Sequence, residues 1–155
     1  MIIKKNIDII IPVYNEGELI LETINSINQN FKLSCNIIIC YDFDEDDTLK
    51  VINNSNLNKE NIIFLKNKLK GAHGAVMTGI RESKSEFVLV IPADDNYNTL
   101  NLMNMYNVLK NDGIDVLCPD RFIEPGSIVN GPFIKFLIVR IVNYSLYYLA
   151  NIQTK

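Results

Sequence analysis

Short apolar runs alternate along the chain with longer segments in which apolar residues recur at helical spacing. The short runs are rich in Ile and Val and are continuous rather than alternating with polar residues, which is typical of strands covered on both faces of a sheet. Five runs of this kind predict strands at residues 7–11, 37–41, 62–65, 87–91 and 114–118.

The segments between these runs have the spacing of amphipathic helices. The first, at about residues 18–30, carries a stripe of apolar residues at helical offsets: Ile20, Ile24, Ile27 and Phe31. Further helices are predicted to start near Asp47, Gly74 and Thr99. Because alternating strands and helices give right-handed crossovers, we predict a doubly wound, Rossmann-like α/β fold, with a mostly parallel sheet and helices on both faces.

The composition indicates a folded domain and argues against a nucleic-acid partner. Of the 155 residues, 48% are hydrophobic and 21% are charged, so the chain can bury enough apolar surface to offset its conformational entropy. The 15 Lys and Arg against 18 Asp and Glu give a net charge of −3, unlike the basic surface of a nucleic-acid-binding protein. We therefore expect no nucleic-acid partner.

The cysteines and the most apolar segments indicate the cellular compartment of the protein. The chain has three cysteines, Cys35, Cys40 and Cys118. Because their number is odd and their spacing is not that of a metal site, we interpret them as reduced core residues of a cytosolic protein. Residues 1–6 have no signal-peptide character, and charged residues interrupt the most lipophilic stretch, 133–152. Neither secretion nor a transmembrane helix is expected.

Polar residues follow four of the five predicted strands, in segments 12–16, 42–47, 92–96 and 119–121. In an open parallel sheet, ligands bind beyond the carboxyl ends of the strands. We therefore expect these segments to form a single polar crevice.

The crevice lacks the usual phosphate-binding loops. A dinucleotide-binding domain would have G-x-G-x-x-G after the first strand, but this chain has Glu16 and Glu18, which would repel a phosphate there. A Walker loop is also absent. The phosphates of any bound nucleotide would need a divalent cation, Mg²⁺ or Mn²⁺, for which Asp oxygens are suitable ligands.

Several segments carry a family resemblance. Residues 10–16, Ile-Ile-Pro-Val-Tyr-Asn-Glu, resemble the opening motif of family 2 glycosyltransferases of the GT-A fold, and residues 40–48 resemble that family's acidic motif V-D-D-G-S-x-D-x-T. Residues 71–80 are similar to the start of its third helix, and residues 93–94 to its metal-binding segment. Residues 120–126 resemble its G-S-R-[YF]-x-x-G stretch, and residues 131–150 resemble the amphipathic region of the polyprenyl-phosphate glycosyltransferases, the dolichyl-phosphate mannose synthase-like branch.

The chain departs from the family pattern at three points. Pro92-Ala93-Asp94 stands in place of D-x-D, and Met77 stands where a basic residue is common. The chain also ends at Lys155, before the family's D-x-T-x-G-[FY]-[RK] segment, so it resembles a truncated catalytic domain.

The resemblance implies roles for residues at the strand ends. Pro12, Tyr14 and Glu16 would line the base and ribose pocket, and Asp42 would accept a hydrogen bond from the base. The alternatives are a helix-start role for Tyr14 and Glu16 and a capped turn for Asp42. Within residues 44–47, Asp46 or Asp47 is expected to cap the next helix.

Further roles concern the diphosphate and the acceptor. Asp94 would be the metal ligand and a catalytic residue, while Asp95 would either share the metal or face solvent. Arg121 would bind a phosphate as a second catalytic residue, or form a salt bridge. Arg140 would meet the phosphate of a lipid acceptor from a helix at the membrane surface, or would belong to a core-packing helix.

These roles imply an inverting, metal-assisted transfer of a sugar from a UDP- or GDP-linked donor to a polyprenyl phosphate, at the cytoplasmic face of the membrane. Residues 1–130 would form the nucleotide-sugar-binding core and residues 131–155 an amphipathic helical segment. The alternatives are a glycosyltransferase that extends a saccharide and a module that binds nucleotide without turnover.

Overall fold

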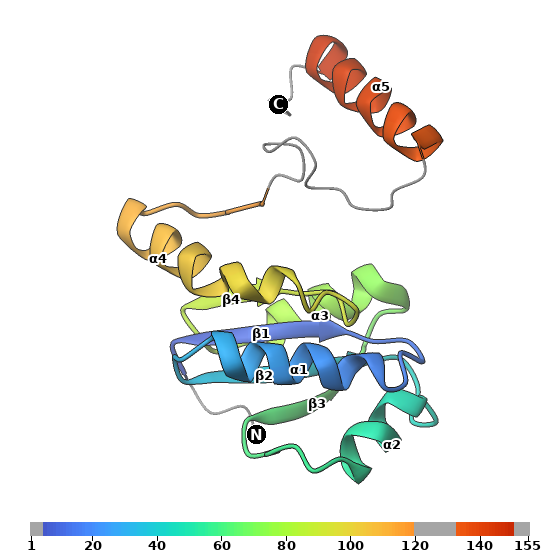
Figure 1. Ribbon diagram of the computed structural model, residues 1–155, viewed down its shortest axis with the longest axis vertical. Coiled ribbons are helices and arrows are strands. Elements are labelled where there is room, and N and C mark those ends of the chain that lie inside the picture. Colours follow the sequence, from blue (N-terminus) through green and yellow to red (C-terminus); the bar gives the residue numbers. More distant parts are fainter. Residues whose placement is uncertain (1–4, 120–132, 151–155) are drawn as a thin grey trace. The chain divides into compact units, whose positions relative to one another are not determined.

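The computed structural model describes residues 5–119 and 133–150 (Figure 1). The chain divides into two compact units, residues 1–114 and residues 115–155, which are described separately. The predicted domain boundary at residue 130 lies outside the described residues and remains a prediction.

Strands and helices alternate through the first unit, as the apolar pattern predicts. In chain order the elements are β1 (Ile7–Pro12), α1 (Leu19–Asn30), β2 (Cys35–Tyr41), α2 (Asp47–Asn54), β3 (Ile62–Lys66), α3 (Gly71–Glu82), β4 (Phe87–Val90), the 3-10 helix η1 (Asn98–Asn101) and α4 (Leu102–Asp112). The second unit contains α5 (Phe133–Ala150).

The four strands form a parallel sheet in the order β3-β2-β1-β4. Ile9 of β1 lies opposite Ile37 of β2 and Leu89 of β4, so β1 and β2 occupy the centre of the sheet. Every residue from Ile7 to Ile11 is fully buried. The predicted α/β architecture is confirmed.

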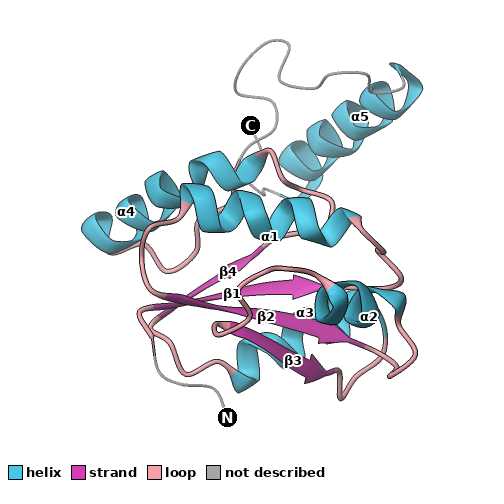
Figure 2. Ribbon diagram, turned by 60° about the horizontal axis from the view of Figure 1, so that its bottom comes forward, coloured by secondary structure: helices cyan, strands magenta, loops and turns pink. Residues whose placement is uncertain are grey.

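Side chains on the two faces of the sheet enter two separate cores. Ile9 and Ile11 point to the face covered by α1, α2 and α4, whereas Ile10 and Ile38 point to the face covered by α3. Figure 2 shows α1 and α4 together on one side of the strands. Helix α3 packs very closely on β1 at Gly79. A Cβ atom added there would lie only 2.7 Å from the Ile10 side chain.

The fifth predicted strand is wrong. Residues 114–118 form no strand, and the side chain of Val116 is 76% exposed. Helix α4 ends at Asp112, and Gly113 after it has a φ of +61°, the left-handed conformation common just beyond helix C-termini. A short apolar run becomes a strand only when a neighbouring strand supplies its hydrogen bonds, and no described strand pairs with this run.

The expectation of three core cysteines holds for two of them. Cys35 and Cys40 are buried on opposite faces of the sheet, and burial raises the pKa of both thiols, that of Cys40 to about 12. Cys118 is exposed, so its placement in the core was wrong. It is the last residue of the run at 114–118, which forms no strand, and it therefore has no sheet to pack into.

Helix α5 of the second unit is largely apolar. The large hydrophobic side chains of its described residues that are exposed are Leu137, Ile138, Ile141, Val142, Tyr144, Tyr147, Tyr148 and Leu149. Within residues 5–119 and 133–150, no helix combines the length and the hydropathy needed to cross a bilayer.

Candidate nucleotide-binding site

The carboxyl ends of β1 and β2 and the start of α3 surround a pocket of about 210 Å³. Its lining residues are Pro12, Val13, Tyr14, Glu16, Asp42, Gly71, Ala72 and Ala75. The four residues predicted to contact the nucleoside, Pro12, Tyr14, Glu16 and Asp42, are therefore brought together in one cavity. Their contact with a nucleotide remains a prediction.

The loop after β1 is fixed by residues at the start of α2. Asn15 has a φ of +53°, and its backbone N–H donates to Asp46 Oδ2 at 3.2 Å. The N–H of Glu16 donates to Thr48 Oγ1 at 3.0 Å, and that of Gly17 donates to Asp47 Oδ1 at 3.1 Å. The acidic second motif thus anchors the first motif.

Asp46 is the cap residue of α2, as one of the two sequence alternatives predicts. Its Oδ1 accepts the N–H of Thr48 at 2.9 Å, and its side chain is fully buried. Its other oxygen binds the Asn15 N–H, so one carboxylate both caps the helix and holds the loop.

Tyr14, which lines the pocket, packs against Phe43. Tyr14 is 65% exposed, and its ring meets that of Phe43 edge to face with 5.4 Å between the centroids. Phe43 is not among the predicted site residues, although it lies within the acidic segment that follows β2.

The carboxylate of Asp42 is held by two donors. Asn67 Nδ2 donates to Asp42 Oδ1 at 2.6 Å, and the Gly71 N–H donates to Asp42 Oδ2 at 2.9 Å. Asn67 is not among the predicted site residues. It directly follows β3, so the same strand-end rule would have found it had the rule been applied to the third strand.

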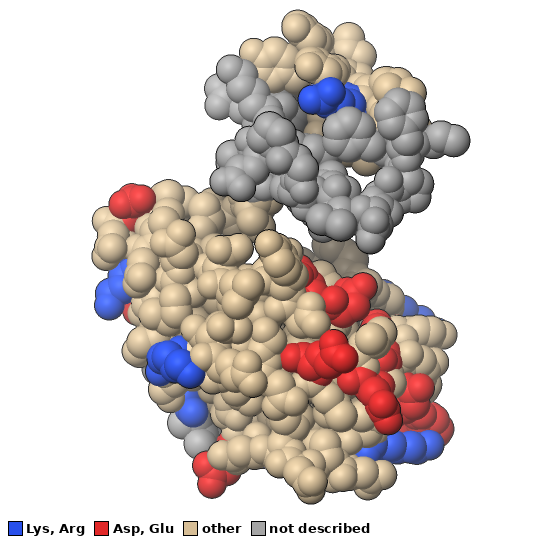
Figure 3. Space-filling view, in the orientation of Figure 1, with Lys and Arg blue, Asp and Glu red and all other residues tan. Residues whose placement is uncertain are grey.

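Glu16 connects this pocket electrostatically with the loop after β4. Burial raises the pKa of Glu16 above its usual value, and the negative charge of Asp94 raises it further. Asp46 and Asp47 act in the same direction, whereas a hydrogen bond with the Tyr14 backbone opposes them. Figure 3 shows acidic side chains gathered on one face of the first unit.

Helix α1 holds the loop that carries Asp94 and Asp95. The buried hydroxyl of Thr23 donates to the Ala93 carbonyl at 2.7 Å, and that of Ser26 donates to the Asn96 carbonyl at 3.0 Å. Ala93 itself is buried. These contacts fix the backbone on both sides of Asp94.

The two aspartates of this loop differ in their surroundings. Asp95 accepts hydrogen bonds from the Asn98 N–H at 3.0 Å and from Asn98 Nδ2 at 2.6 Å, so both of its oxygens are engaged at the start of η1. Asp94 is exposed and makes no hydrogen bond or ion pair with another described residue. Asp94 is therefore more available than Asp95 as a ligand for a metal ion.

The carboxylates near the pocket suit a cation whose coordination shell is completed by oxygens of the substrate. No group of three His, Cys, Asp or Glu side chains within the described residues could enclose a metal ion by itself. Magnesium commonly binds through one or two carboxylates, substrate phosphates and water. An exposed carboxylate such as Asp94 fits that mode.

Two further residues were predicted to contact phosphates, Arg121 and Arg140. Arg121 lies outside the described residues, and its phosphate contact remains a prediction. Arg140 is exposed on α5 in the second unit.

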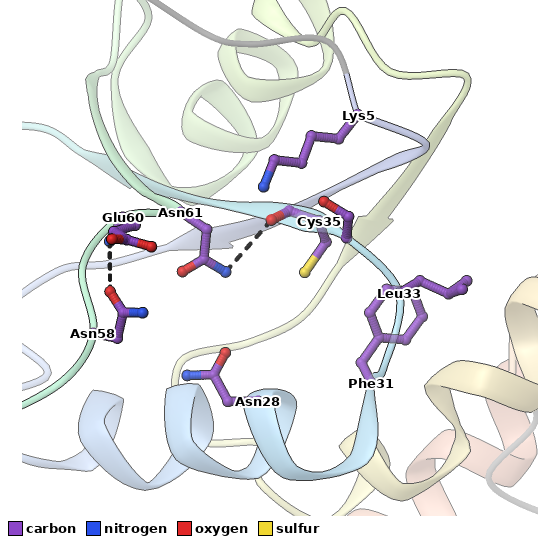
Figure 4. Close-up of a pocket in the computed structure, with 9 residues that line it drawn as sticks. Lys5, Asn28, Phe31, Leu33, Cys35, Asn58, Glu60 and Asn61 are labelled. Carbon is purple, nitrogen blue, oxygen red and sulfur yellow. Dashed lines mark hydrogen bonds between the residues drawn. The ribbon is translucent and has the colours of Figure 1, made fainter.

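A second pocket, of about 440 Å³, lies at the amino ends of the strands (Figure 4). Lys5, Cys35 and Asn61 line it, and Asn61 Nδ2 donates to the Cys35 carbonyl at 3.4 Å. It is the larger cavity. Because ligands of open parallel sheets bind at the carboxyl ends, the smaller pocket is the better candidate.

Comparison with known proteins decides the family. The sequence model of Glycosyl transferase family 2 matches residues 8–152. The chain belongs to this family. The predicted resemblance is thereby confirmed.

Family 2 relatives are found among curated proteins of bacteria and archaea. The chain is 30% identical, over 82% of its length and 50% of the relative's, to the Escherichia coli UDP-Glc:alpha-D-GlcNAc-diphosphoundecaprenol beta-1,3-glucosyltransferase WfaP. It is 26% identical, over 85% of its length and 38% of the relative's, to the dolichol-phosphate mannosyltransferase of Pyrococcus furiosus. It thus spans half or less of the length of these relatives.

The fold of this family 2 domain also has solved counterparts. S. aureus TarS, residues 1–349, superimposes with a TM-score of 0.60 at 19% identity, covering 77% of this chain and 40% of TarS. The same protein in complex with UDP-GlcNAc gives a TM-score of 0.58 at 18% identity, covering 80% of this chain and 40% of that one. The predicted GT-A fold is confirmed.

Proposed function

We propose that this family 2 domain transfers a sugar from a nucleoside-diphosphate sugar, UDP- or GDP-linked, to a polyprenyl-phosphate acceptor, with inversion at the anomeric carbon. The observation that carries the proposal is the pocket at the carboxyl ends of β1 and β2, which Pro12, Tyr14, Glu16 and Asp42 all line. The acidic loop with Asp94 influences Glu16 in the same pocket.

The pocket residues suit a nucleoside. Tyr14, whose ring is braced by Phe43, offers a flat apolar surface against which a base can stack, and Asp42 offers carboxylate oxygens to a base N–H. Uracil and guanine both present a ring N–H, which is why UDP and GDP are the proposed carriers. Pro12 shapes the wall at the end of β1.

Asp94 would hold Mg²⁺ or Mn²⁺ beside the diphosphate, with Asp95 as a further candidate ligand. When bound, such an ion supplies positive charge that stabilises the departing nucleoside diphosphate. The contribution of the chain is to place Asp94, which it does through the Thr23 and Ser26 hydrogen bonds to the adjoining backbone. Arg121 is a second proposed phosphate contact.

The proposed reaction is a direct displacement. An acceptor oxygen forms the new bond to the anomeric carbon as the bond to the diphosphate oxygen breaks, which inverts the configuration. A phosphate monoester has a second pKa of about 6, so a polyprenyl phosphate would be anionic at neutral pH and would need no general base.

A lipid acceptor is supported by the relatives and by α5. The name of one relative contains dolichol phosphate, and that of another contains GlcNAc-diphosphoundecaprenol, a sugar carried on a lipid diphosphate. Helix α5 carries exposed apolar and aromatic residues together with Arg140, a composition that suits a membrane surface. We therefore propose peripheral contact with the cytoplasmic membrane face and a role in cell-envelope polysaccharide synthesis, with Arg140 near the lipid phosphate.

A second candidate is transfer to a polyol-phosphate or saccharide acceptor. It is favoured by 32% identity, over 71% of this chain and 18% of the relative, to the poly(ribitol-phosphate) beta-glucosyltransferase of Bacillus spizizenii. Such an acceptor hydroxyl requires a general base. A third candidate, nucleotide binding without turnover, is favoured by Pro92 in place of the first Asp of D-x-D.

Thermal-shift titration tests the donor site. UDP, GDP and their sugars are added with and without Mn²⁺ to the wild-type chain, to Asp94→Ala and to a control, Asp112→Ala, at the end of α4. A ligand at about 100 times its Kd stabilises a protein by about 2.7 kcal/mol, which is readily detected. We expect metal-dependent stabilisation of the wild type and the control only. Equal stabilisation of Asp94→Ala would refute the metal role.

A further inference from the structure

The orientation of the Asn67 side-chain amide is fixed by the groups around it. Its Oδ1 accepts the Leu69 N–H at 2.9 Å and the Thr78 hydroxyl at 2.9 Å. Because a carboxamide has one acceptor atom and one donor atom, Nδ2 must point the other way, toward Asp42 and the Gly71 carbonyl.

Asn67 also joins three elements through its backbone and side chain. Its N–H donates to the Tyr41 carbonyl at 2.7 Å, which ties the end of β3 to the end of β2. The Thr78 contact ties it to α3. Close packing restricts the loop between them, since a Cβ atom on Gly74 would lie 2.7 Å from Leu69 Cβ.

These contacts define how Asp42 faces the pocket. Asn67 Nδ2 donates to one of its oxygens and the Gly71 N–H donates to the other, so the plane of the carboxylate is set from two sides. Each oxygen of a carboxylate has room for a further hydrogen bond. Asp42 and Gly71 both line the pocket, whereas Asn67 does not. Asn67 therefore acts on the pocket through Asp42.

We propose that Asn67 is a positioning residue that keeps Asp42 as a hydrogen-bond acceptor toward the base and so makes the pocket select bases with a ring N–H. This inference rests on the proposed nucleotide-binding function. The ring nitrogen of uracil that carries hydrogen can donate to Asp42. The corresponding nitrogen of cytosine is an acceptor, and its lone pair would face a carboxylate oxygen that has no hydrogen to give.

The test compares UDP with CDP by isothermal titration calorimetry on the full 155-residue chain. The variants are Asn67→Ala, which removes the donor, and Asn67→Asp, which keeps the shape but places an oxygen against Asp42. Asn61→Ala is the matched control, because Asn61 makes its side-chain hydrogen bond at the opposite end of the sheet. Circular dichroism verifies that each variant is folded.

We expect the wild type and Asn61→Ala to prefer UDP over CDP. A hydrogen bond to a charged group is commonly worth tenfold or more in affinity, so Asn67→Ala and Asn67→Asp should reduce the UDP-to-CDP ratio by about tenfold. A merely structural role would weaken both nucleotides equally and leave the ratio unchanged. That outcome would overturn the inference while leaving the proposed function intact.

A measurement on the wild type does not depend on the variants folding. The side-chain amide resonance of Asn67 should shift when UDP binds, since its partner Asp42 gains a hydrogen bond. Binding of UDP without such a shift would also overturn the inference. If the wild type binds neither UDP nor GDP, the proposed function fails first and the inference fails with it.

Discussion

Thr48 Oγ1 accepts a hydrogen bond from the backbone N–H of Glu16 at 3.0 Å, across 32 residues of sequence. The contact joins the first turn of α2 to the loop that lines the candidate base pocket. Together with the Asp46 and Asp47 contacts, it makes the acidic segment a support for that loop.

Replacing Thr48 by Val should therefore affect both stability and binding. The variant keeps the shape of a fully buried side chain but leaves the Glu16 N–H without this acceptor. We expect a loss of about 1 kcal/mol in the free energy of unfolding, measured with urea, and weaker UDP binding. Ser145→Ala, which removes an exposed hydroxyl bond within α5, is the control and should alter neither. Unchanged stability and binding in Thr48→Val would contradict the anchoring role.

Thr23 gives a second prediction, concerning the loop with Asp94. Thr23→Val removes the hydroxyl that binds the Ala93 carbonyl at 2.7 Å and leaves that carbonyl buried without this donor. An unsatisfied buried polar group costs about 1–3 kcal/mol, so the unfolding free energy should fall by about that amount.

The same variant should also raise the Mn²⁺ concentration needed for half-maximal nucleotide binding, because the backbone beside Asp94 is released. A loss of stability with an unaltered Mn²⁺ requirement would show that Thr23 supports the core only. The measurement is a Mn²⁺ titration at fixed nucleotide concentration, with the wild type in parallel.

The raised pKa of Glu16 predicts a pH-dependent cost in stability. Burial and the charge of Asp94 favour the protonated form in the folded state more than in the unfolded state. The free-energy cost of ionised Glu16 is therefore absent below the pKa of the unfolded state, near 4.5. It appears as the pH rises through the higher pKa of the folded state.

Glu16→Gln should abolish this dependence. In metal-free buffer, we expect the stability of the variant relative to the wild type to increase from pH 4 upward and then to level off; urea denaturation at several pH values measures the difference. A relative stability that stays constant with pH would show that Asp94 and the burial of Glu16 impose no such cost.

Much of the fold could be predicted from the sequence because the central strands are continuous apolar runs. Residues 7–11 and 37–40 are buried between helices, as such runs predict. The run at residues 114–118 has the same composition but no described partner strand, and composition alone cannot supply one.

Asp8 shows where the apolar pattern gives no information. It lies within β1 and is fully buried, with its carboxylate accepting hydrogen bonds from Asn36, Ser83 and Ser85 at 2.7–2.8 Å. The three donors are 28 to 77 residues away in sequence. Such a set depends on tertiary structure, which a local pattern does not contain.

The strand-end rule indicated the residues at the ends of β1 and β2: Pro12, Tyr14, Glu16 and Asp42 line one pocket. No described residue of the segments at 92–96 and 119–121, to which the rule was also applied, lines that pocket. Asn67, which follows β3, was missed. The engagement of Asp95 by Asn98 could not be read from adjacent acidic residues, because it depends on how the chain enters η1.

The most direct test of the central claim is an NMR titration of the isotope-labelled chain with UDP and GDP in the presence of Mg²⁺. The account predicts that the backbone resonances of Tyr14, Asp42 and Gly71 shift together and saturate with one affinity. Shifts confined to Lys5, Cys35 and Asn61, which line the pocket at the opposite end of the sheet, or no saturable shift with either nucleotide, would contradict it.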